Sequence, residues 1–292
     1  MISSIKLKLE WYINRLLSEV FLRKVFLNSK FKNNVESHKL PKKLVVSFTS
    51  YKPRFATLLP TVLSLLQQKV VPDAIVLWVS SEDYKHIPRS IMKLQGKVND
   101  QGTTFEILKT IDTGPYKKII PTLAHFKDQF VVTADDDIYY PAWWLQHLLE
   151  EYTGNDGVII CYRAHEITFS AKNTINPYNE WITNKPNVDR YLGFPVGVGG
   201  VFYPPASLDA LVTNDDVFLK ECPMADDIWL FWMARINGSI TKKTRKQFKP
   251  ICWPESQKVG LIITNVENNG NDQKIQNMLN RFGWPVNNKK SP

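Results

Sequence analysis

The sequence has few of the patterns that mark disulfide-stabilised, zinc-binding or dinucleotide-binding proteins. Its three cysteines are odd in number and widely spaced, and no CxxC pair occurs. This excludes a disulfide framework and a zinc knuckle, and we expect reduced, structural thiols. No HxxxH or HExxH spacing is present, which argues against a zinc hydrolase. No GxGxxG pattern follows the first expected strand, so a dinucleotide site is disfavoured.

Long apolar runs are also absent. No stretch reaches the roughly 18 uninterrupted apolar residues that span a bilayer. The N-terminus lacks the compact apolar block and the small-residue cleavage site of a signal peptide. We therefore expect a cytoplasmic protein, which its basic N-terminus could also bring to the inner face of a membrane as a peripheral protein.

The composition is that of a globular protein with a basic surface. At 292 residues, with 43% hydrophobic and 12% aromatic content, the chain can form the core of one large α/β domain or of two small ones. The formal charge of +9 predicts an anionic partner. Charge alone leaves open whether this partner is a nucleotide, a nucleic acid or a lipid surface.

Residues 1–43 differ from the rest of the chain. Apolar residues recur there at near-helical spacing, with lysines and arginines between them. This pattern predicts a basic amphipathic helix, which can lie in an anionic membrane interface. Packing against the domain's own core, or a contact between two copies of the chain, explains the same pattern equally well.

From Leu44 onwards, short β-branched runs alternate with helical patterns. The alternation predicts an α/β fold with right-handed βαβ crossovers and a mostly parallel sheet flanked by helices. Residues 164–200 lose this regularity and predict a long loop of the kind that is usually functional or mobile. We expect a catalytic domain at 44–255 and a C-terminal segment with a polar, Asn-rich tail at 256–292. The expected strands are 44–49, 74–79, 105–109, 130–134 and 158–162, and the expected helices are about 56–68, 117–126, 141–152 and 226–236.

The most informative motif is the triplet Asp135-Asp136-Asp137 at the end of the apolar run 130–134. Adjacent carboxylates repel one another, so their clustering favours a bound divalent cation. Hard oxygen ligands select Mg²⁺ or Mn²⁺, which share their remaining positions with water and substrate phosphates. Capping of a helix near Pro141 is the competing explanation, although a cap requires only one carboxylate.

Two further motifs place charges at the starts of expected helices. The turn from Asp112 to Lys118 combines a Gly-Pro pair with two lysines, which favours phosphate binding or else forms a solvated basic patch. Asp226 and Asp227 precede an apolar helical run, where they either cap the helix or bring a carboxylate into a site. A like-charged neighbour can raise the pKa of such a carboxylate to a value useful for proton transfer.

In their order along the chain, these motifs resemble those of nucleotide-sugar-dependent glycosyltransferases of the GT-A fold, in particular the bacterial family 2-like members. The resemblance implies a Rossmann-like GT-A sheet, a nucleoside-diphosphate sugar as donor, and Mn²⁺ or Mg²⁺ as cofactor. It covers about residues 44–252 and rests on four segments, which are SFTSY (47–51), DTGPYKK (112–118), DDD (135–137) and ADDIWL (225–230).

The resemblance also assigns roles. The triplet corresponds to the family's DxD motif, and alternation along an extended segment would put Asp135 and Asp137 on one side as metal ligands, with Asp136 pointing away. The second acid of the later pair implies Asp227 as the general base, supported by Asp226. The remaining candidates are donor nucleotide- and phosphate-binding Thr49, Tyr51, Arg54, Asp112, Lys117, Lys118, Asp135 and Asp136, and donor-sugar or acceptor-contacting His165, Gly199 and Gly200.

Some of these assignments have ordinary structural alternatives. The loop that holds Tyr51 and Arg54 is equally consistent with a polar turn, and a lone histidine such as His165 is more often structural than functional. Some GT-A enzymes use a late histidine as a metal ligand, but this chain has none after His165. Asn265, Asp272 or water would have to substitute.

The expected function is therefore an inverting, metal-dependent glycosyltransferase. It would move a sugar from a nucleoside-diphosphate donor, with a UDP-sugar expected, to a hydroxyl of a bacterial surface glycan or its lipid-linked precursor. A sugar-1-phosphate nucleotidyltransferase is an alternative, although the Gly-rich first loop of that class is absent. A non-enzymatic basic protein of membrane surfaces or nucleic acids is a third interpretation, and the clustered carboxylates argue against nucleic acid as a partner.

Overall fold

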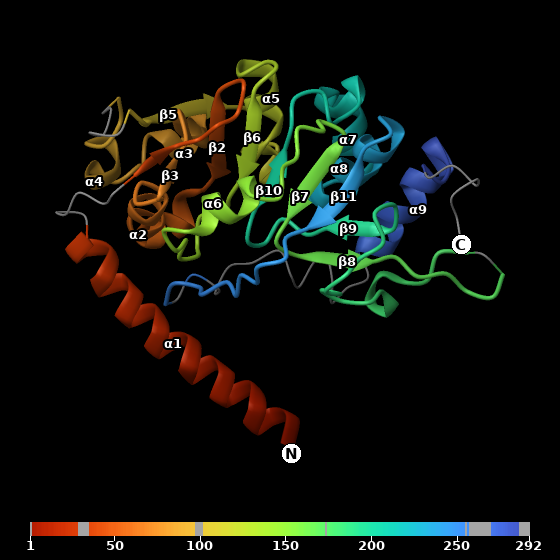
Figure 1. The fold of residues 1–292 in the computed structure, drawn as a ribbon, viewed down its shortest axis with the longest axis horizontal. Helices are drawn as coiled ribbons and strands as arrows, with labels where there is room; N and C mark the ends of the chain where they lie inside the picture. The colour runs from red at the N-terminus through yellow and green to blue at the C-terminus, as the bar shows by residue number, and fades with distance from the viewer. Residues whose placement is uncertain are drawn as a thin grey trace.

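The computed structural model describes residues 2–28, 35–96, 102–172, 174–254, 256 and 270–285. A seven-stranded sheet forms its centre, and helices cover both faces of the sheet (Figure 1). In spatial order, the strands are β11 (Ile240–Lys243), β7 (Val158–Cys161), β10 (Val201–Tyr203), β6 (Phe130–Thr133), β2 (Leu44–Thr49), β4 (Ala74–Ser80) and β5 (Thr104–Thr110).

The remaining elements are helices, short 3-10 turns and two small strand pairs. The small pairs are β1 (Glu36–Ser37) with β3 (Val70–Val71), and β8 (Ala164–Glu166) with β9 (Gly193–Pro195). The helices are α1 (Ile2–Asn28), α2 (Phe55–Leu65), α3 (Ser81–Tyr84), α4 (Arg89–Met92), α5 (Ile120–His125), α6 (Trp144–Leu149), α7 (Asp215–Glu221), α8 (Asp226–Ile236) and α9 (Gly270–Phe282), and the 3-10 turns are η1 (Lys52–Arg54), η2 (Gly114–Lys118), η3 (Tyr178–Glu180) and η4 (Ala210–Thr213).

The central sheet is mostly parallel, which confirms the predicted fold class. β2 pairs in parallel with β4 and β6, β4 pairs in parallel with β5, and β7 pairs in parallel with β11. β10 runs antiparallel between β6 and β7, with Val201 opposite Thr133. The carboxyl ends of β2 and β6 and the beginning of β10 therefore meet at one edge of the sheet, the edge where open α/β sheets bind ligands.

The side chains of each strand point alternately to the two faces of the sheet, and they pack into two hydrophobic cores, one on each face. Val46 and Phe48 of β2 pack in one core with Leu58 of α2. Val131 of β6 packs in the other core with Trp229 of α8. Because successive strand residues point to opposite faces, both faces of these strands are covered and their sequences are mostly apolar. The position of α8 on the second face brings its first residues to the ligand edge.

The predicted helix at 117–126 is divided in the structure. Residues 114–118 form η2, and α5 begins only at Ile120. Pro121 provides the physical reason, because proline lacks the N–H that would have to donate to the carbonyl of Lys117 in a continuous helix. A new helix therefore starts with Pro121 in its first turn.

Two regions expected to be irregular contain regular structure. The loop at 164–200 includes the antiparallel pair of β8 and β9. Where the sequence analysis expected a polar tail from Gly270 onwards, the structure instead forms α9. Ile275 and Met278 are buried in the same core as α8. Their spacing of three residues gives α9 a narrow apolar stripe, which the abundant Asn and Gln side chains conceal in the composition.

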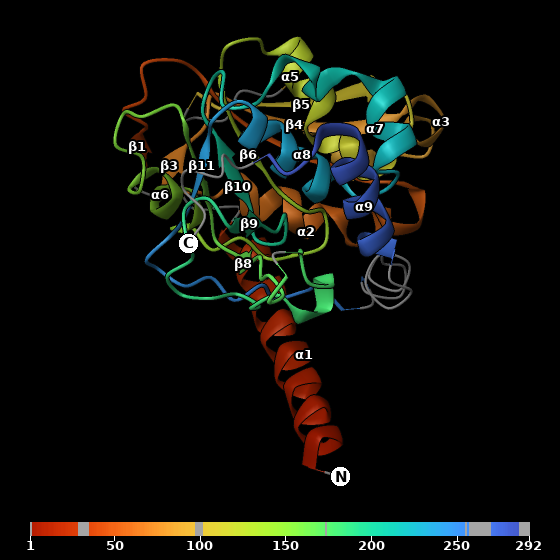
Figure 2. The same cartoon turned by 90° about the vertical axis from the view of Figure 1, so that its right-hand side faces the viewer.

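The N-terminal helix α1 extends away from the rest of the molecule (Figures 1 and 2). Its last turns contact the body, where Val25 is buried with Tyr139 and Trp253. The ring of Phe21 stacks on that of Tyr139 with 4.3 Å between centroids. A helix is thus confirmed over Ile2–Asn28. None of the helices in the described ranges is long and apolar enough to cross a bilayer.

Candidate functional site

The aspartate triplet follows β6 at the ligand edge of the sheet. The strand pairing extends to Ala134, whose N–H donates to the carbonyl of Ser47, and the backbone then bends at Asp136 and Asp137. These two residues are only 3% and 7% exposed. Because a buried carboxylate is costly without a partner, each must be compensated nearby.

Arg54 compensates the second and third aspartates from the end of η1. Its Nη1 lies 2.7 Å from Oδ1 of Asp136 and 3.2 Å from Oδ2 of Asp137. Burial would lower the pKa of Arg54, but the charges of the two aspartates outweigh burial and raise it. The expected alternation, with Asp136 pointing away from Asp137, is therefore wrong. The bend at these residues brings both carboxylates to one cation.

Asp135 contacts a different cation. Its backbone N–H donates to Oη of Tyr140 at 2.6 Å, and its Oδ1 lies 4.0 Å from Nζ of Lys118. Burial raises the pKa of Asp135 to about 6, against the opposing charge of Lys118. The triplet thus divides its carboxylates between two cations that come from different loops.

Lys118 joins the triplet to the acidic pair at the start of α8. Its Nζ lies 2.9 Å from Oδ2 of Asp226, and its side chain is 11% exposed. Burial would lower the pKa of Lys118, but the carboxylates of Asp226 and Asp135 outweigh burial and raise it. Two acidic motifs that are far apart in the sequence therefore meet across one ammonium group.

Asp227 is held by backbone and remains available to a proton. The N–H of Gly197 donates to both of its carboxylate oxygens, at 3.1 Å each. Burial raises the pKa of Asp227 to about 6, and the charge of Asp226 adds to this rise while Lys118 opposes it. A carboxylate with such a pKa accepts and releases a proton near neutral pH, which is the property that a general base needs.

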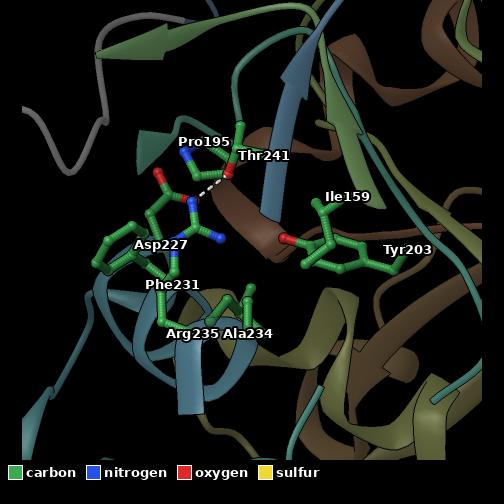
Figure 3. A pocket seen from close by; sticks show the side chains of 9 residues that line it. Ile159, Pro195, Tyr203, Asp227, Phe231, Ala234, Arg235 and Thr241 are labelled. Atoms are coloured by element: carbon green, nitrogen blue, oxygen red, sulfur yellow. Dashed lines mark hydrogen bonds between the residues drawn. The ribbon is translucent and has the colours of Figure 1, made fainter. Parts of the chain in front are cut away.

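A cavity of about 10 Å³ lies beside Asp227, with room for about one water molecule (Figure 3). Arg235 closes one wall, where its Nη2 donates to Oγ1 of Thr241 at 2.6 Å. The same nitrogen donates to the carbonyl of Gly193 at 2.8 Å, at the start of β9. The buried guanidinium thereby fixes the segment that leads to Pro195, another residue of the cavity wall.

Carboxylate oxygens of the triplet fit a hard cation. Oδ2 of Asp135 and Oδ2 of Asp136 are buried and take part in no hydrogen bond with the described residues. Buried oxygens without partners are ligands of the type that Mg²⁺ and Mn²⁺ prefer. Within those same residues, no group of three or more His, Cys, Asp or Glu side chains could hold an ion. A cation at the triplet would therefore complete its coordination with water or phosphate oxygens.

The candidates named for completing the metal coordination are not brought to the triplet by any observed contact. Oδ1 of Asp272 accepts a hydrogen bond from the backbone N–H of Tyr178 at 2.7 Å. Asn265 lies outside the described residues. Water and substrate oxygens are the completing ligands that agree with this arrangement.

The predicted donor-binding residues fall into two groups. Arg54 and Lys118 face the carboxylates described above, and the Tyr51 ring centroid lies 5.8 Å from the Arg54 guanidinium. Thr49 instead donates its hydroxyl to the carbonyl of Trp78 within the sheet. Lys117 forms an ion pair with Asp112, and both residues are thus engaged with each other.

The predicted sugar-contacting residues are held by the protein itself. His165 is buried in β8, where its Nδ1 accepts the N–H of Asn184 at 3.1 Å. Burial lowers the pKa of His165 to about 4, so it is neutral at physiological pH. Gly200 has φ +107°, and a Cβ there would lie 2.7 Å from the Trp144 ring. The carbonyl of Gly199 accepts the Trp144 indole N–H at 2.6 Å.

The sequence analysis missed Arg163 as a candidate, and it considered Gly197 only as part of the segment expected to line the donor sugar. Gly197 lies against Asp227 and Lys118, since a Cβ at this position would be 3.0 Å from Oδ1 of Asp227 and 3.0 Å from Nζ of Lys118. Arg163 follows β7, its Nε is buried without a hydrogen-bond partner among the described residues, and its charge opposes the raised pKa of Asp227. Both precede or follow a short strand at the ligand edge, which is the only sequence signal that marks them.

Comparisons with known proteins add two solved structures. No family model matches the chain, and no curated protein matches it. The chain is similar to the inositol-1-phosphate CTP transferase from T. maritima, with a TM-score of 0.38 and 13% identity, over 84% of this chain and 98% of that one. It is also similar to GalNAc-T7, solved with UDP, GalNAc and Mn²⁺, with a TM-score of 0.43 and 10% identity, over 85% of this chain and 57% of that one. At TM-scores this low, the function has to be inferred from the chain's own residues.

Proposed function

We propose that this chain is an inverting, metal-dependent glycosyltransferase of GT-A architecture. It would transfer a sugar from a nucleoside-diphosphate sugar, with a UDP-sugar as the first choice, to a hydroxyl of a bacterial surface glycan or of its lipid-linked precursor. The observation that carries the proposal is the position of Lys118, 4.0 Å from Asp135 and 2.9 Å from Asp226. The aspartate triplet, as the proposed cation site, and the acidic pair that contains the candidate general base would thus act together at the ligand edge of one sheet.

Asp227, next to Asp226, is the proposed general base. Asp227 would take the proton of the acceptor hydroxyl as that oxygen attacks the anomeric carbon. The Gly197 N–H fixes both carboxylate oxygens, so the base is oriented before the acceptor binds. Burial raises the pKa of Asp227 to about 6, and the charge of Asp226 adds to this rise while that of Lys118 opposes it.

The triplet is the proposed site of the divalent cation. Asp135 and Asp137 are the ligands that the family resemblance implies, and Asp136 lies in the same cluster with a buried oxygen that has no hydrogen-bond partner. When bound, Mn²⁺ or Mg²⁺ would offset the negative charge that builds on the departing nucleoside diphosphate. Arg54 contacts the same carboxylates and is the side chain best placed to contact the donor's phosphates as well.

A panel of nucleotide sugars tests the proposal directly. The purified chain is incubated with each donor and Mn²⁺ or Mg²⁺, and release of nucleoside diphosphate is measured with and without EDTA. We expect one donor to be turned over or hydrolysed only with the metal, and the same donor to raise the melting temperature. Asp137→Ala should abolish both effects, whereas Asp128→Ala, at an exposed ion pair with Lys42, should retain them.

Other results would point to the competing functions. Release of pyrophosphate from a sugar-1-phosphate and a nucleoside triphosphate would assign the chain to the nucleotidyltransferases. Strongly salt-dependent binding to nucleic acid, without metal dependence or turnover of any donor, would replace the enzyme assignment altogether.

A further inference from the structure

The N-terminal helix α1 has two faces with different surroundings. One face contacts the body of the molecule, where Ser18 and Val25 are 0% and 1% exposed. Nδ2 of Asn14 donates to the carbonyl of Cys252 at 3.5 Å, and Nε2 of Gln67 donates to the carbonyl of Val25 at 2.8 Å. This inner face is fully explained by packing within the chain.

The opposite face of α1 is apolar and exposed. At about 100° per residue its large apolar side chains fall on one side of the helix, and Arg23 and Lys24 lie on the same side between Val20 and Leu27. They are called here the outer stripe, and their exposed fractions decide its character: Ile13 43%, Leu16 64%, Leu17 38%, Val20 61% and Leu27 63%. Exposed apolar side chains that gather on one face over several helical turns mark an interaction surface.

The charges on α1 indicate what kind of partner this is. The helix contains five basic residues and two acidic ones. Arg23 and Lys24 are exposed at the level of the outer stripe. Basic side chains beside an apolar stripe match an anionic bilayer, whose headgroups take the charges while its acyl boundary takes the apolar side chains.

A second copy of the chain fits this surface less well. In a two-fold contact, the same patch lies on both partners. Pairing of the outer stripe with itself would therefore remove the exposed cations Arg23 and Lys24 of both copies from water, which is costly. The direction of α1 also favours a surface, because the N-terminal part of the helix extends away from the body (Figures 1 and 2).

We infer that the outer stripe of α1 binds the interface of an anionic lipid bilayer, with the helix parallel to the membrane surface. The apolar side chains enter the acyl boundary, and Arg23 and Lys24 contact phosphate headgroups. The inner face keeps its contacts with the body, so the catalytic domain is held beside the membrane. The inference concerns where the chain works and stands independently of the reaction that it catalyses.

Co-sedimentation with lipid vesicles tests this inference on the full chain. Vesicles of phosphatidylcholine alone are compared with vesicles that also contain phosphatidylglycerol. We expect the wild-type chain to pellet with the anionic vesicles only. The double variant Leu16→Glu, Val20→Glu should bind at least about tenfold more weakly. Lys24→Gln should bind about fivefold more weakly, as expected for one cation at an anionic surface.

A control variant separates the outer stripe from a general change of charge. Ile111→Glu, Leu219→Glu adds the same two charges at apolar side chains that are 74% and 44% exposed outside α1. It should bind vesicles far better than Leu16→Glu, Val20→Glu. All variants change exposed positions, and unaltered melting temperatures will show that they are folded.

Three results would overturn the inference. The wild-type chain could fail to bind anionic vesicles, or Leu16→Glu, Val20→Glu could bind as well as the wild type. Light scattering could instead show a wild-type dimer that this double variant converts to a monomer, without vesicle binding, and the outer stripe would then be assigned to a second copy of the chain. Neither the donor panel nor the metal dependence affects these readouts.

Discussion

Replacing Asp227 with asparagine should suppress catalysis and, at alkaline pH, stabilise the fold. The pKa of Asp227 is raised from 3.8 to about 6 by burial and by the charge of Asp226. For an acid with a raised pKa in the folded state, the contribution to stability is complete below pH 3.8 and is lost as the pH rises through 6. The ionised carboxylate therefore costs the folded state about 3 kcal/mol at pH 8.

Asparagine removes this cost because it is neutral at every pH. Its carbonyl oxygen can still accept the N–H of Gly197, so the local hydrogen bond is retained. At pH 8, Asp227→Asn should be up to about 3 kcal/mol more stable than the wild type, which is roughly 6 °C in melting temperature for a chain of this size. Near pH 4 the two proteins should melt at similar temperatures.

The neighbouring acid provides a matched control. Asp226→Asn removes the carboxylate that lies 2.9 Å from Lys118, and breaking such a buried ion pair costs about 3 kcal/mol or more. The two variants should therefore shift the melting temperature in opposite directions at pH 8. Thermal melts at pH 4 and pH 8, recorded without added metal, measure both effects.

Turnover completes the test. With the donor identified by the panel, Asp227→Asn should lower the rate of transfer by about 10²- to 10⁴-fold while donor binding is retained. Full activity of this variant would reject Asp227 as the base. A lower stability at pH 8 than the wild type would show that the carboxylate is compensated more completely than its burial implies.

Three further predictions concern Gly200, Gly197 and the buried acid Glu151. Gly200→Ala should destabilise the fold by about 1–3 kcal/mol, since its Cβ would lie 2.7 Å from the Trp144 indole ring. Gly238 also has a positive φ but lies in open space, so Gly238→Ala should lower the free energy of unfolding, measured by chemical denaturation, by less. Gly197→Ala should change the melting temperature little but lower turnover, because its Cβ would lie 3.0 Å from a carboxylate oxygen of Asp227. Glu151→Gln should lower the free energy of unfolding by about 2 kcal/mol at pH 7, since hydrogen bonds from basic partners outweigh burial and lower the pKa of Glu151 to about 2. The contribution of the ionised Glu151 to stability is present above pH 4.5 and is lost as the pH falls through 2. Free energies of unfolding measured with urea should therefore converge for the two proteins near pH 2.

The alternation of strands and helices could be predicted from the sequence because burial on both faces leaves a direct signature. β2 and β4 are mostly apolar and are buried along almost their whole length, and the structure places both inside the sheet. The position of the triplet at the ligand edge followed from the same reasoning. Such features depend on local composition, which the sequence contains in full.

Features that depend on packing between distant segments could not be predicted in this way. The pairing of Arg54 with Asp136 results from a bend that no local pattern marks. Gly200 was interpreted as a point of ligand approach, whereas the space beside it is filled by Trp144. In α9, a narrow stripe that includes Ile275 is buried against α8, although the composition suggested a polar tail.

The antiparallel strand β10 has a consequence for how the protein folds. Val201 pairs with Thr133 only after the chain has passed through β7, β8 and β9 and returned to the middle of the sheet. Such long-range closure is slow, because the entropy of a large loop is lost before the pairing is gained. Gly197 and Thr133 belong to segments that this closure joins, so a chain in which β10 has not yet paired would lack the assembled candidate site around Asp227.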